Sequence, residues 1–401
     1  MLVQFKFRNF GSFKDEAVFD MRAIKAYKEH PYNLINEPEK TPLLKVAAIY
    51  GANASGKSNF VEAYSYFLDI VRNSFSKKEK SEKGTVLSTN YKSFLFDDET
   101  MDSDTEFEAV YNDNGYEFRY GFIYNANRIQ YEWLYRRSIE TGRQISIIER
   151  SPDSFTLGAS VRRTCEKYVS AIDEDVSALS FFSSLKLRNN VFRDMLKNVV
   201  SVIALDFTWN GAVDYWIAQY FDEGYNENEK TKLLSFIHAI DVGIKDLSIE
   251  KNGKNIDVYT YHITKNGKLK KVPIKIESDG TRKAIVLYSF VQVAISKKKG
   301  MIVDELNIQL HPLLLKYIID LFYNENTCGQ LIYTTHDTTL LNKRFMRRDQ
   351  IWFISKNTYG ESSLYSLAEF KVRNDQSFEK EYLGGVYGGI PELKDFSFLE
   401  E

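Results

Sequence analysis

The sequence predicts an α/β fold built on a mixed, mainly parallel central sheet, and three segments carry that prediction. Val46–Tyr50 is a continuous apolar run, typical of a buried strand, and a glycine-rich turn follows it at once. Met301–Val303 and Leu331–Thr335 are two further apolar runs, and each ends in ionisable side chains. Because the carboxyl ends of parallel strands share one edge of a sheet, where ligands bind in such folds, we expect these polar residues to meet there.

Residues 1–150 are expected to form a lobe rich in strands around the first segment. Residues 2–8 alternate between apolar and polar, residues 16–21 offer a second short strand, and residues 22–42 are expected to be a polar loop. Helical spacing follows the glycine-rich turn at Phe60, Val61, Tyr64, Phe67, Leu68 and Val71. Strands are expected around the Asn114-Gly115 turn signal at Phe107–Tyr111, Tyr116–Tyr124, Arg128–Arg136 and Gln144–Glu149.

Residues 151–245 change to helical periodicity, which predicts a helical insertion between the two halves of the α/β fold. The expected helices are Val161–Leu185, Phe192–Val200, Ala212–Phe221 and Lys230–Ile240. The segment lacks sustained heptads, so a long coiled coil is not predicted.

Residues 246–401 are expected to complete the α/β lobe. Asn252-Gly253 and Asn266-Gly267 predict hairpins between strands near residues 246–250, 256–263 and 269–276. A helix is expected to follow residue 283, and Pro312 stands where a second helix begins. Terminal strands are expected at Ile351–Ser355 and Ser362–Leu367.

Two charged segments each allow an ordinary interpretation and a functional one. Lys77–Gly84 is expected to be a solvated loop, with contact to a phosphate backbone as the alternative. The second hairpin is expected to present a solvated strand face, with a surface that binds nucleic acid as the alternative. The lysines that make this hairpin basic are Lys265, Lys268, Lys270, Lys271 and Lys275.

Bulk properties describe an ordinary globular protein. The chain has 401 residues, 43% of them hydrophobic and 27% charged, and its net charge of −2 gives no global attraction to nucleic acid. Cys165 and Cys328 lie far apart and form no CxxC pair, so neither a zinc site nor a disulfide framework is predicted, and a reducing cytoplasmic setting is expected. No apolar run reaches about 18 residues, so no membrane span is expected.

The glycine-rich turn fits the P-loop pattern Gly-x4-Gly-Lys-Ser/Thr, whose backbone amides cradle phosphates. Lys57 is expected to reach the β- and γ-phosphates of ATP, and Ser58 to ligate Mg²⁺. Asn53 and Ala54 occupy positions where glycine is common, which suits the loop if its backbone needs no positive φ there. The expected nucleotide-binding residues are Gly51, Ala52, Asn53, Ala54, Ser55, Gly56, Lys57, Ser58 and Asn59.

The other two segments supply residues suited to hydrolysis. Asp304 is expected to bind Mg²⁺, usually through water, and Glu305 to orient or deprotonate the attacking water. His336 closes the next strand and is expected to sense the γ-phosphate and position water. His311, which precedes Pro312, either caps the loop after Glu305 or takes a functional part.

A further pair, Ser278 and Gly280, precedes a predicted helix. A hydroxyl, a close backbone and a helix dipole together make an anion site, with simple helix capping as the alternative. This Ser-x-Gly-x-x-Lys segment comes shortly before the Asp304-Glu305 pair.

The order of these motifs resembles the ABC-type ATPase heads of the SMC, RecF and OLD lineages. Residues 8–13 resemble the start of those heads, where the first strand and its loop support the nucleotide. Three segments are more similar to the prokaryotic AAA-15/AAA-21 ATPases, the RloA-like and abortive-infection group, namely Tyr50–Asn59, Val303–Pro312 and Thr334–Leu341.

The resemblance implies an ABC/SMC-type P-loop ATPase head that hydrolyses ATP with Mg²⁺. It implies a head-to-tail homodimer or higher oligomer, in which Ser278 and Gly280 of one chain face a nucleotide site of the other. That site would comprise Lys57, Ser58, Asp304, Glu305 and His336. The family's usual Leu-Ser-Gly-Gly is Glu277-Ser278-Asp279-Gly280 here, so Asp279 near a phosphate needs Mg²⁺ or an outward rotamer.

The resemblance also implies a role, the gating of a separately encoded effector in bacterial anti-phage defence of the abortive-infection kind. The alternative is a RecF-like ATPase of DNA repair or DNA maintenance that binds DNA. A third class is a nucleotide-binding scaffold with negligible turnover. No zinc-hook cysteines and no acidic Toprim-like block follow the ATPase motifs, so this chain alone is not expected to be a nuclease.

Overall fold

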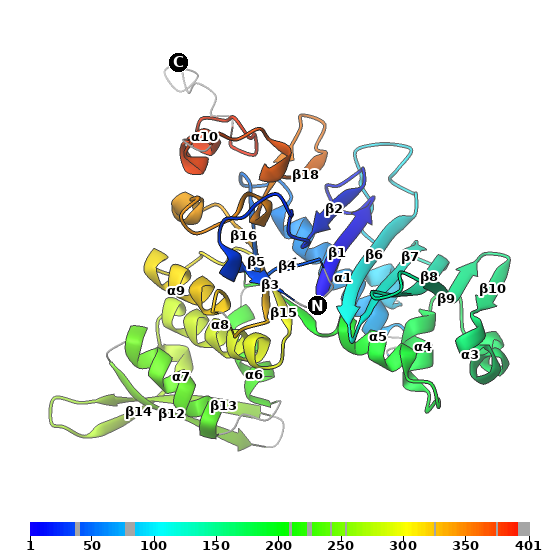
Figure 1. The fold of residues 1–401 in the computed structure, drawn as a ribbon. Helices are drawn as coiled ribbons and strands as arrows, with labels where there is room; N and C mark the ends of the chain where they lie inside the picture. Colours follow the sequence, from blue (N-terminus) through cyan, green and yellow to red (C-terminus); the bar gives the residue numbers. More distant parts are fainter. Residues whose placement is uncertain are drawn as a thin grey trace, which may run out of the picture.

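The computed structural model of the chain describes residues 1–36, 41–76, 85–207, 211–222, 227–240, 243–252, 255–324, 326–373 and 376–391. The predicted charged loop Lys77–Gly84 and Gly253 of the first hairpin turn lie outside these residues. The described chain forms the predicted α/β fold around several sheets, with the three largest visible in Figure 1. None of its helices is long and apolar enough to cross a membrane.

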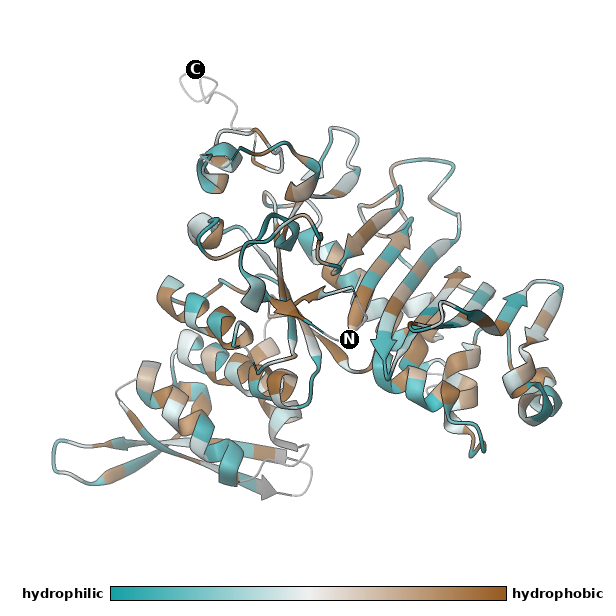
Figure 2. Ribbon diagram, viewed as in Figure 1, coloured by the Kyte–Doolittle hydropathy of each residue, from teal (hydrophilic) through white to brown (hydrophobic). Residues whose placement is uncertain are grey.

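The central sheet has the strand order β11-β15-β16-β5-β17-β18. The first five strands run parallel, and β18 pairs antiparallel with β17. Every residue of β5 is buried, which explains its unbroken apolar run (Figure 2). The strands are β5 (Val46–Tyr50), β11 (Val202–Leu205), β15 (Gly300–Val303), β16 (Gln330–Thr335), β17 (Ile351–Lys356) and β18 (Ser362–Ser366).

Helix α1 (Lys57–Asn73) lies between the central sheet and an antiparallel sheet of order β10-β9-β8-β7-β6-β1-β2. Phe60 and Phe67 of α1 pack their rings on Phe5 of β1, and Phe67 also meets Phe107 of β6. This aromatic layer fixes α1, and with it the turn that precedes the helix. The sheet comprises β1 (Leu2–Arg8), β2 (Ala17–Asp20), β6 (Thr105–Asp113), β7 (Tyr116–Tyr124), β8 (Ile129–Ser138), β9 (Gln144–Ser151) and β10 (Ser154–Leu157).

The opposite face of the central sheet is covered by α8 (Asp279–Ser296) and α9 (Pro312–Phe322). Successive residues of β5 point to opposite faces of the central sheet. Ala47 and Ile49 join the core around α1, whereas Ala48 joins the core around α8 and α9. The central sheet is therefore buried on both faces, and its exposed chemistry is confined to its edges.

The middle segment, residues 151–245, is less purely helical than predicted. Strands β10 and β11 lie within it and pair with the antiparallel and the central sheet, respectively. The single helix predicted over Val161–Leu185 is divided into two helices with a 3₁₀ turn between them. The second helix starts after Ser177, whose hydroxyl accepts a hydrogen bond from the Ser180 backbone. The helices are α3 (Ala159–Cys165), α4 (Ala178–Ser184), α5 (Val191–Val199), α6 (Ala212–Asp222) and α7 (Glu227–Ile240).

A three-stranded sheet projects at the lower left of Figure 1, beside α7. It contains the two predicted hairpins, with strands β12 (Ile244–Asn252), β13 (Asn255–Ile263) and β14 (Leu269–Pro273). The remaining short elements are β3 (Leu34–Ile35), β4 (Leu43–Leu44), α2 (Val86–Thr89) and α10 (Phe378–Leu383).

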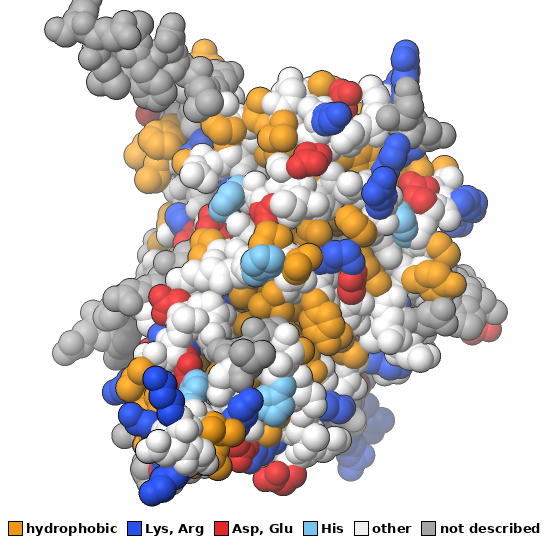
Figure 3. All heavy atoms as spheres, turned by 90° about the vertical axis from the view of Figure 1, so that its left-hand side faces the viewer, with side chains coloured by type: hydrophobic (Ala, Val, Ile, Leu, Met, Phe, Trp, Pro, Cys, Tyr) orange, Lys and Arg blue, Asp and Glu red, His pale blue; other side chains and the backbone are white. Residues whose placement is uncertain are grey.

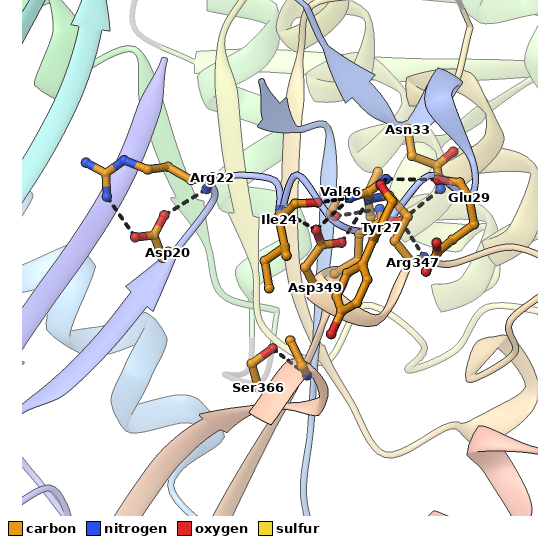
Figure 4. Close-up of polar contacts among 12 residues, drawn as sticks. Asp20, Arg22, Ile24, Tyr27, Glu29, Asn33, Val46, Arg347, Asp349 and Ser366 are labelled. Atoms are coloured by element: carbon orange, nitrogen blue, oxygen red, sulfur yellow. Dashed lines mark hydrogen bonds and ion pairs between the residues drawn. The ribbon is translucent and has the colours of Figure 1, made fainter. Parts of the chain in front are cut away.

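A buried ion pair holds the loop between β2 and β5 against the segment before β17 (Figure 4). Arg347 is 1% exposed and pairs with Asp349 at 2.7 Å. The same guanidinium donates to the backbone oxygens of Ile24, Tyr27 and Glu29. This segment was predicted only as a polar loop, and these contacts hold its residues 24–29 in place.

Candidate active site

The turn between β5 and α1 forms a braced P-loop. Gly56 adopts φ 116°, and a Cβ there would lie 2.5 Å from Ser362 Oγ and 2.7 Å from Ser12 Oγ, so only glycine fits. The Ser362 hydroxyl is 2.6 Å from both Ser12 Oγ and the backbone oxygen of Ser55. Ser12 belongs to residues 8–13, the segment that resembles the start of ATPase heads. Ser362 begins β18 and was not predicted to take part.

Ala54 overturns one expectation about this loop. Its φ of 61° lies in the left-handed region, whereas Asn53 is not among the residues with positive φ. The expectation that neither backbone needs a positive φ is therefore wrong for Ala54. Because a side chain in this region meets the following carbonyl, the position costs about 1–2 kcal/mol relative to right-handed backbone.

Lys57 is a buried cation held by neutral groups. It is 4% exposed, and its Nζ donates to the backbone oxygens of Gly51 and Ala52, each at 2.9 Å. Burial lowers the pKa of Lys57, while the charges of Glu305 and Asp304 oppose that fall. The buried Ser55 hydroxyl has no protein partner within the described ranges. A desolvated ammonium and an orphaned hydroxyl in an amide-rich turn fit a polyphosphate ligand.

Asp304 follows β15, which is separated from β5 by β16 in the central sheet, and it meets the P-loop helix. It is 2% exposed and hydrogen-bonds with Thr334, whose Oγ1 lies 2.5 Å away, and with Ser58. Burial raises the pKa of Asp304, and these two hydrogen bonds partly offset the rise. A hydroxyl and a carboxylate side by side are the oxygen donors that Mg²⁺ prefers, with phosphate oxygens and water completing its shell. The structure thus brings together both residues predicted to bind the metal.

Glu305 occupies a constrained backbone position. Its φ is 46°, its backbone nitrogen donates to Thr334 Oγ1 at 2.8 Å, and its backbone oxygen accepts from Lys283 Nζ at 3.0 Å. Thr334 therefore contacts both residues of the carboxylate pair. A threonine inside an apolar strand gave no sign of this in the sequence, because the contact depends on the pairing of β15 with β16.

Two further charged groups lie at the site: Asp206, which sequence reasoning missed, and Lys283, which was named only as the last residue of the Ser-x-Gly-x-x-Lys segment. Leu205 of β11 accepts a hydrogen bond from the Asp304 backbone, so Asp206 follows on the same edge and its charge adds to the raised pKa of Asp304. The sequence does contain a signal for Asp206, because Val202–Asp206 is another apolar run that ends in a carboxylate. Lys283 lies on α8, where its helical spacing alone predicted no role.

The predicted histidines differ in their settings. His336 lies at the end of β16 as expected, but its side chain is exposed and its Nε2 is 3.4 Å from Asn307 Nδ2. His311 caps α9, with its Nδ1 accepting from the Leu313 backbone at 3.2 Å. The capping interpretation of His311 is therefore confirmed. Asn59, which was expected to bind nucleotide, is half-buried, and its side chain bonds to Ser12 and Lys92 and so braces the loop.

Ser278 and Gly280 lie at the start of α8, where Ser278 is exposed and Gly280 is half-buried. The Ser278 hydroxyl caps the helix by accepting from the Thr281 backbone at 3.2 Å. The Asp279 side chain is 65% exposed and turns toward Arg282, 3.3 Å away. This exposed position is one of the two arrangements that were expected to allow a phosphate near Asp279, the other being neutralisation by Mg²⁺.

Comparison with known proteins gives one family and several similar folds. The family model described as "AAA domain, putative AbiEii toxin, Type IV TA system" matches residues 46–342, and comparison with curated proteins finds no match. An SMC head bound to the C-winged helix domain of ScpA is 15% identical with a TM-score of 0.43, over 95% of this chain and 99% of that one.

Two further solved structures are similar. The SMC head domain from Thermotoga maritima is 13% identical with a TM-score of 0.41, over 91% of this chain and 98% of that one. The Smc head domain with a coiled coil and joint from Pyrococcus yayanosii is 10% identical with a TM-score of 0.41, over 96% of this chain and 99% of that one. At this level, the likenesses carry no argument about function.

Proposed function

Because the chain belongs to this AAA-domain family, we propose that it binds ATP at the P-loop and hydrolyses it to ADP and phosphate. The observation that carries the proposal is the contact between Ser58 and Asp304, beside the buried ammonium of Lys57. Residues from two separate strand ends thus offer metal-binding oxygens and a phosphate-binding cation at one place.

The side chains suit an in-line displacement. Lys57 would exchange its two backbone carbonyls for the β- and γ-phosphates, and Ser58 and Asp304 would hold Mg²⁺. The metal would neutralise charge on the phosphates. Glu305 would take a proton from water while the water oxygen bonds to the γ-phosphorus. The bond from phosphorus to the β–γ bridging oxygen then breaks, and its electron pair leaves with ADP.

We also propose that ATP joins two chains head to tail. Ser278 and its helix start are exposed, and the hydroxyl is held by Thr281 of its own helix. The first turn of α8 therefore offers amides and a hydroxyl to a phosphate outside its own chain. This supports the two-chain site that the sequence resemblance implies, with ATP between the P-loop of one chain and Ser278 and Gly280 of the other.

The test is the mass of the Glu305→Gln variant in light scattering with ATP and Mg²⁺. Without its carboxylate the variant should bind ATP and hydrolyse it poorly, so the closed dimer should accumulate and the mass should double. A Lys57→Ala, Glu305→Gln double variant is the control and should stay monomeric. A Glu305→Gln variant that binds ATP but remains monomeric would refute the sandwich.

The biological role we propose is the gating of a separate effector in defence against phage. The family description, which names a toxin and a toxin–antitoxin system, supports it. A strain expressing the chain with its neighbouring genes should plate phage less efficiently than a strain carrying Lys57→Ala. Equal plating by the two strains would count against the role.

DNA binding is the second candidate function. The hairpin of β13 and β14 exposes Lys265, Lys268 and Lys270, and in Figure 3, which views the molecule from this side, basic side chains gather at the lower left. Lys271 pairs with Glu250 and lies 3.8 Å from the centre of the Tyr259 ring, so it is less available.

Salt-dependent binding to duplex DNA tests this candidate. Neutralising Lys268, Lys270 and Lys271 together should abolish such binding if the hairpin carries it. Neutralising the consecutive lysines 297–299 at the end of α8 is the matched control. Binding that survives the first triple variant would exclude the hairpin.

A further inference from the structure

Lys283 joins α8 to the carboxylate edge of its own chain. Its side chain is 1% exposed, and its Nζ donates to the backbone oxygen of Glu305 at 3.0 Å. The Phe207 ring lies 5.1 Å from the same ammonium. Burial lowers the pKa of Lys283 to about 8, and the charges of Glu305, Asp304 and Asp206 limit that fall. Lys283 therefore faces the carboxylate pair from α8, as Lys57 does from the P-loop.

A second contact joins the same two segments. A Cβ at Gly280 would lie 2.6 Å from the backbone oxygen of Gln309, so helix start and loop touch directly. The Gln309 side chain donates to Asp279 at 3.3 Å. Glu305 and Gln309 both have positive φ, 46° and 60°. The N-terminal part of α8 thus contacts the loop after β15 at two strained positions, through Lys283 at Glu305 and through Asp279 and Gly280 at Gln309.

We propose that Lys283 is a positioning residue that transmits contact at Ser278 and Gly280 to the conformation of Glu305 in the same chain. The inference rests on the function proposed above, in which Ser278 and Gly280 contact ATP bound by a second chain. A movement of the first turn of α8 toward that ATP displaces Lys283, and Lys283 pulls on the Glu305 carbonyl.

Glu305 is suited to respond to such a pull. A glutamate at φ 46° is strained, and it keeps this conformation only while its surroundings hold it. Its carbonyl is held by Lys283 and its nitrogen by Thr334, so a small shift of either partner changes where the carboxylate points. Each ATP site then reports its occupancy to the other through α8, which makes hydrolysis cooperative in ATP.

The experiment compares Lys283→Met with Lys283→Arg and with a matched control. Lys45 is also a buried lysine, 2% exposed, whose Nζ donates to a backbone oxygen, that of Asn324 at 2.8 Å. It precedes β5, at the opposite end of this strand from the P-loop. Lys45→Met therefore reproduces the loss of a buried, carbonyl-bonded ammonium without touching the site.

The measurements are the steady-state ATPase rate against ATP concentration and the Kd of a fluorescent ATP analogue. The unmodified chain should give a Hill coefficient above 1. Lys283→Met should lower kcat by about 10- to 100-fold, the loss expected for a displaced catalytic group, with Kd unchanged within about threefold. Its Hill coefficient should fall to 1. Lys283→Arg should recover part of the lost kcat and part of the cooperativity. Lys45→Met should keep the kcat and the Hill coefficient of the unmodified chain.

Retained affinity shows that a slow Lys283→Met variant is folded. A Hill coefficient of 1 in the unmodified chain would overturn the coupling, as would an unchanged Hill coefficient in Lys283→Met, whether or not kcat falls. A Glu305→Gln variant that fails to dimerise would instead remove the proposed function. If that variant dimerises and Lys283→Met retains its Hill coefficient, only the coupling is wrong.

Discussion

Thr334 Oγ1 donates a hydrogen bond to Asp304 Oδ1 at 2.5 Å, and this contact links the end of β16 to the carboxylate edge of β15. The same oxygen accepts from the Glu305 backbone at 2.8 Å. One threonine thus orients both the proposed metal ligand and the proposed base.

Thr334→Val should raise the Mg²⁺ concentration needed for half-maximal ATPase activity. The hydroxyl that orients this buried carboxylate is lost, so the carboxylate is held less firmly in a position to bind the metal. A hydrogen bond to a charged group contributes about 1.5–3 kcal/mol, so the shift should be at least about tenfold. Thr334→Ser keeps the hydroxyl and should behave as the parent. If Thr334→Val needs the same Mg²⁺ concentration as the parent, the hydroxyl does not affect metal binding.

Lys57→Ala should abolish ATP binding and remove stabilisation by nucleotide. In the parent, thermal unfolding should shift upward as ATP and Mg²⁺ are added, because a ligand that binds only the folded state stabilises it. In the variant, the midpoint should not move. A titration by differential scanning fluorimetry checks both. Retained tight binding by Lys57→Ala would remove the P-loop assignment.

Ala54→Gly should stabilise the chain, whereas Ala52→Gly should destabilise it. Ala54 has φ 61° and Ala52 is not among the residues with positive φ. Glycine relieves the left-handed strain of about 1–2 kcal/mol at position 54. At position 52 it only adds freedom to the unfolded chain, at a cost of about 0.4–1 kcal/mol. Urea unfolding of both variants measures the difference. The same sign at both positions would contradict the strain.

Arg347→Met should lower the free energy of unfolding by about 3–5 kcal/mol, because it leaves the Asp349 carboxylate buried without its partner. The backbone oxygens of Ile24, Tyr27 and Glu29 also lose their donor. Arg344→Met is the control, since Arg344 is exposed, and should change stability by no more than about 0.5 kcal/mol. Chemical denaturation compares the two. Equal losses would show that the buried pair does not hold the loop.

Local patterns located the strands that reach the site. The continuous apolar runs at β5, β15 and β16 appear where predicted, because strands buried on both faces leave a run that needs no partner to be recognised. β11 was missed because its short apolar run lies among segments with helical periodicity. Asp206, which follows it, was missed with it.

The helical segment shows a different limit. Periodicity predicts a helical face but not where a helix is interrupted. Ser177 caps the new helix α4 locally, and a distant residue also holds the start of that helix. The buried carboxylate of Glu132 on β8 accepts hydrogen bonds from the backbones of Ala178 and Leu179 at the start of α4. A contact across more than forty positions of chain leaves no local signal.

Features that depend on neighbouring residues could be predicted from the sequence. A strand, a glycine turn and a helix in immediate succession specify the P-loop, and an apolar run specifies where Asp304 and Glu305 emerge. Contacts between strands and helices that are distant in the chain became visible only in the folded structure. Thr334 meets Asp304 because β15 pairs with β16, and Lys283 meets Glu305 because α8 packs on that sheet. Residue type and spacing indicate the chemistry a position can perform, whereas its partners depend on how the elements pack.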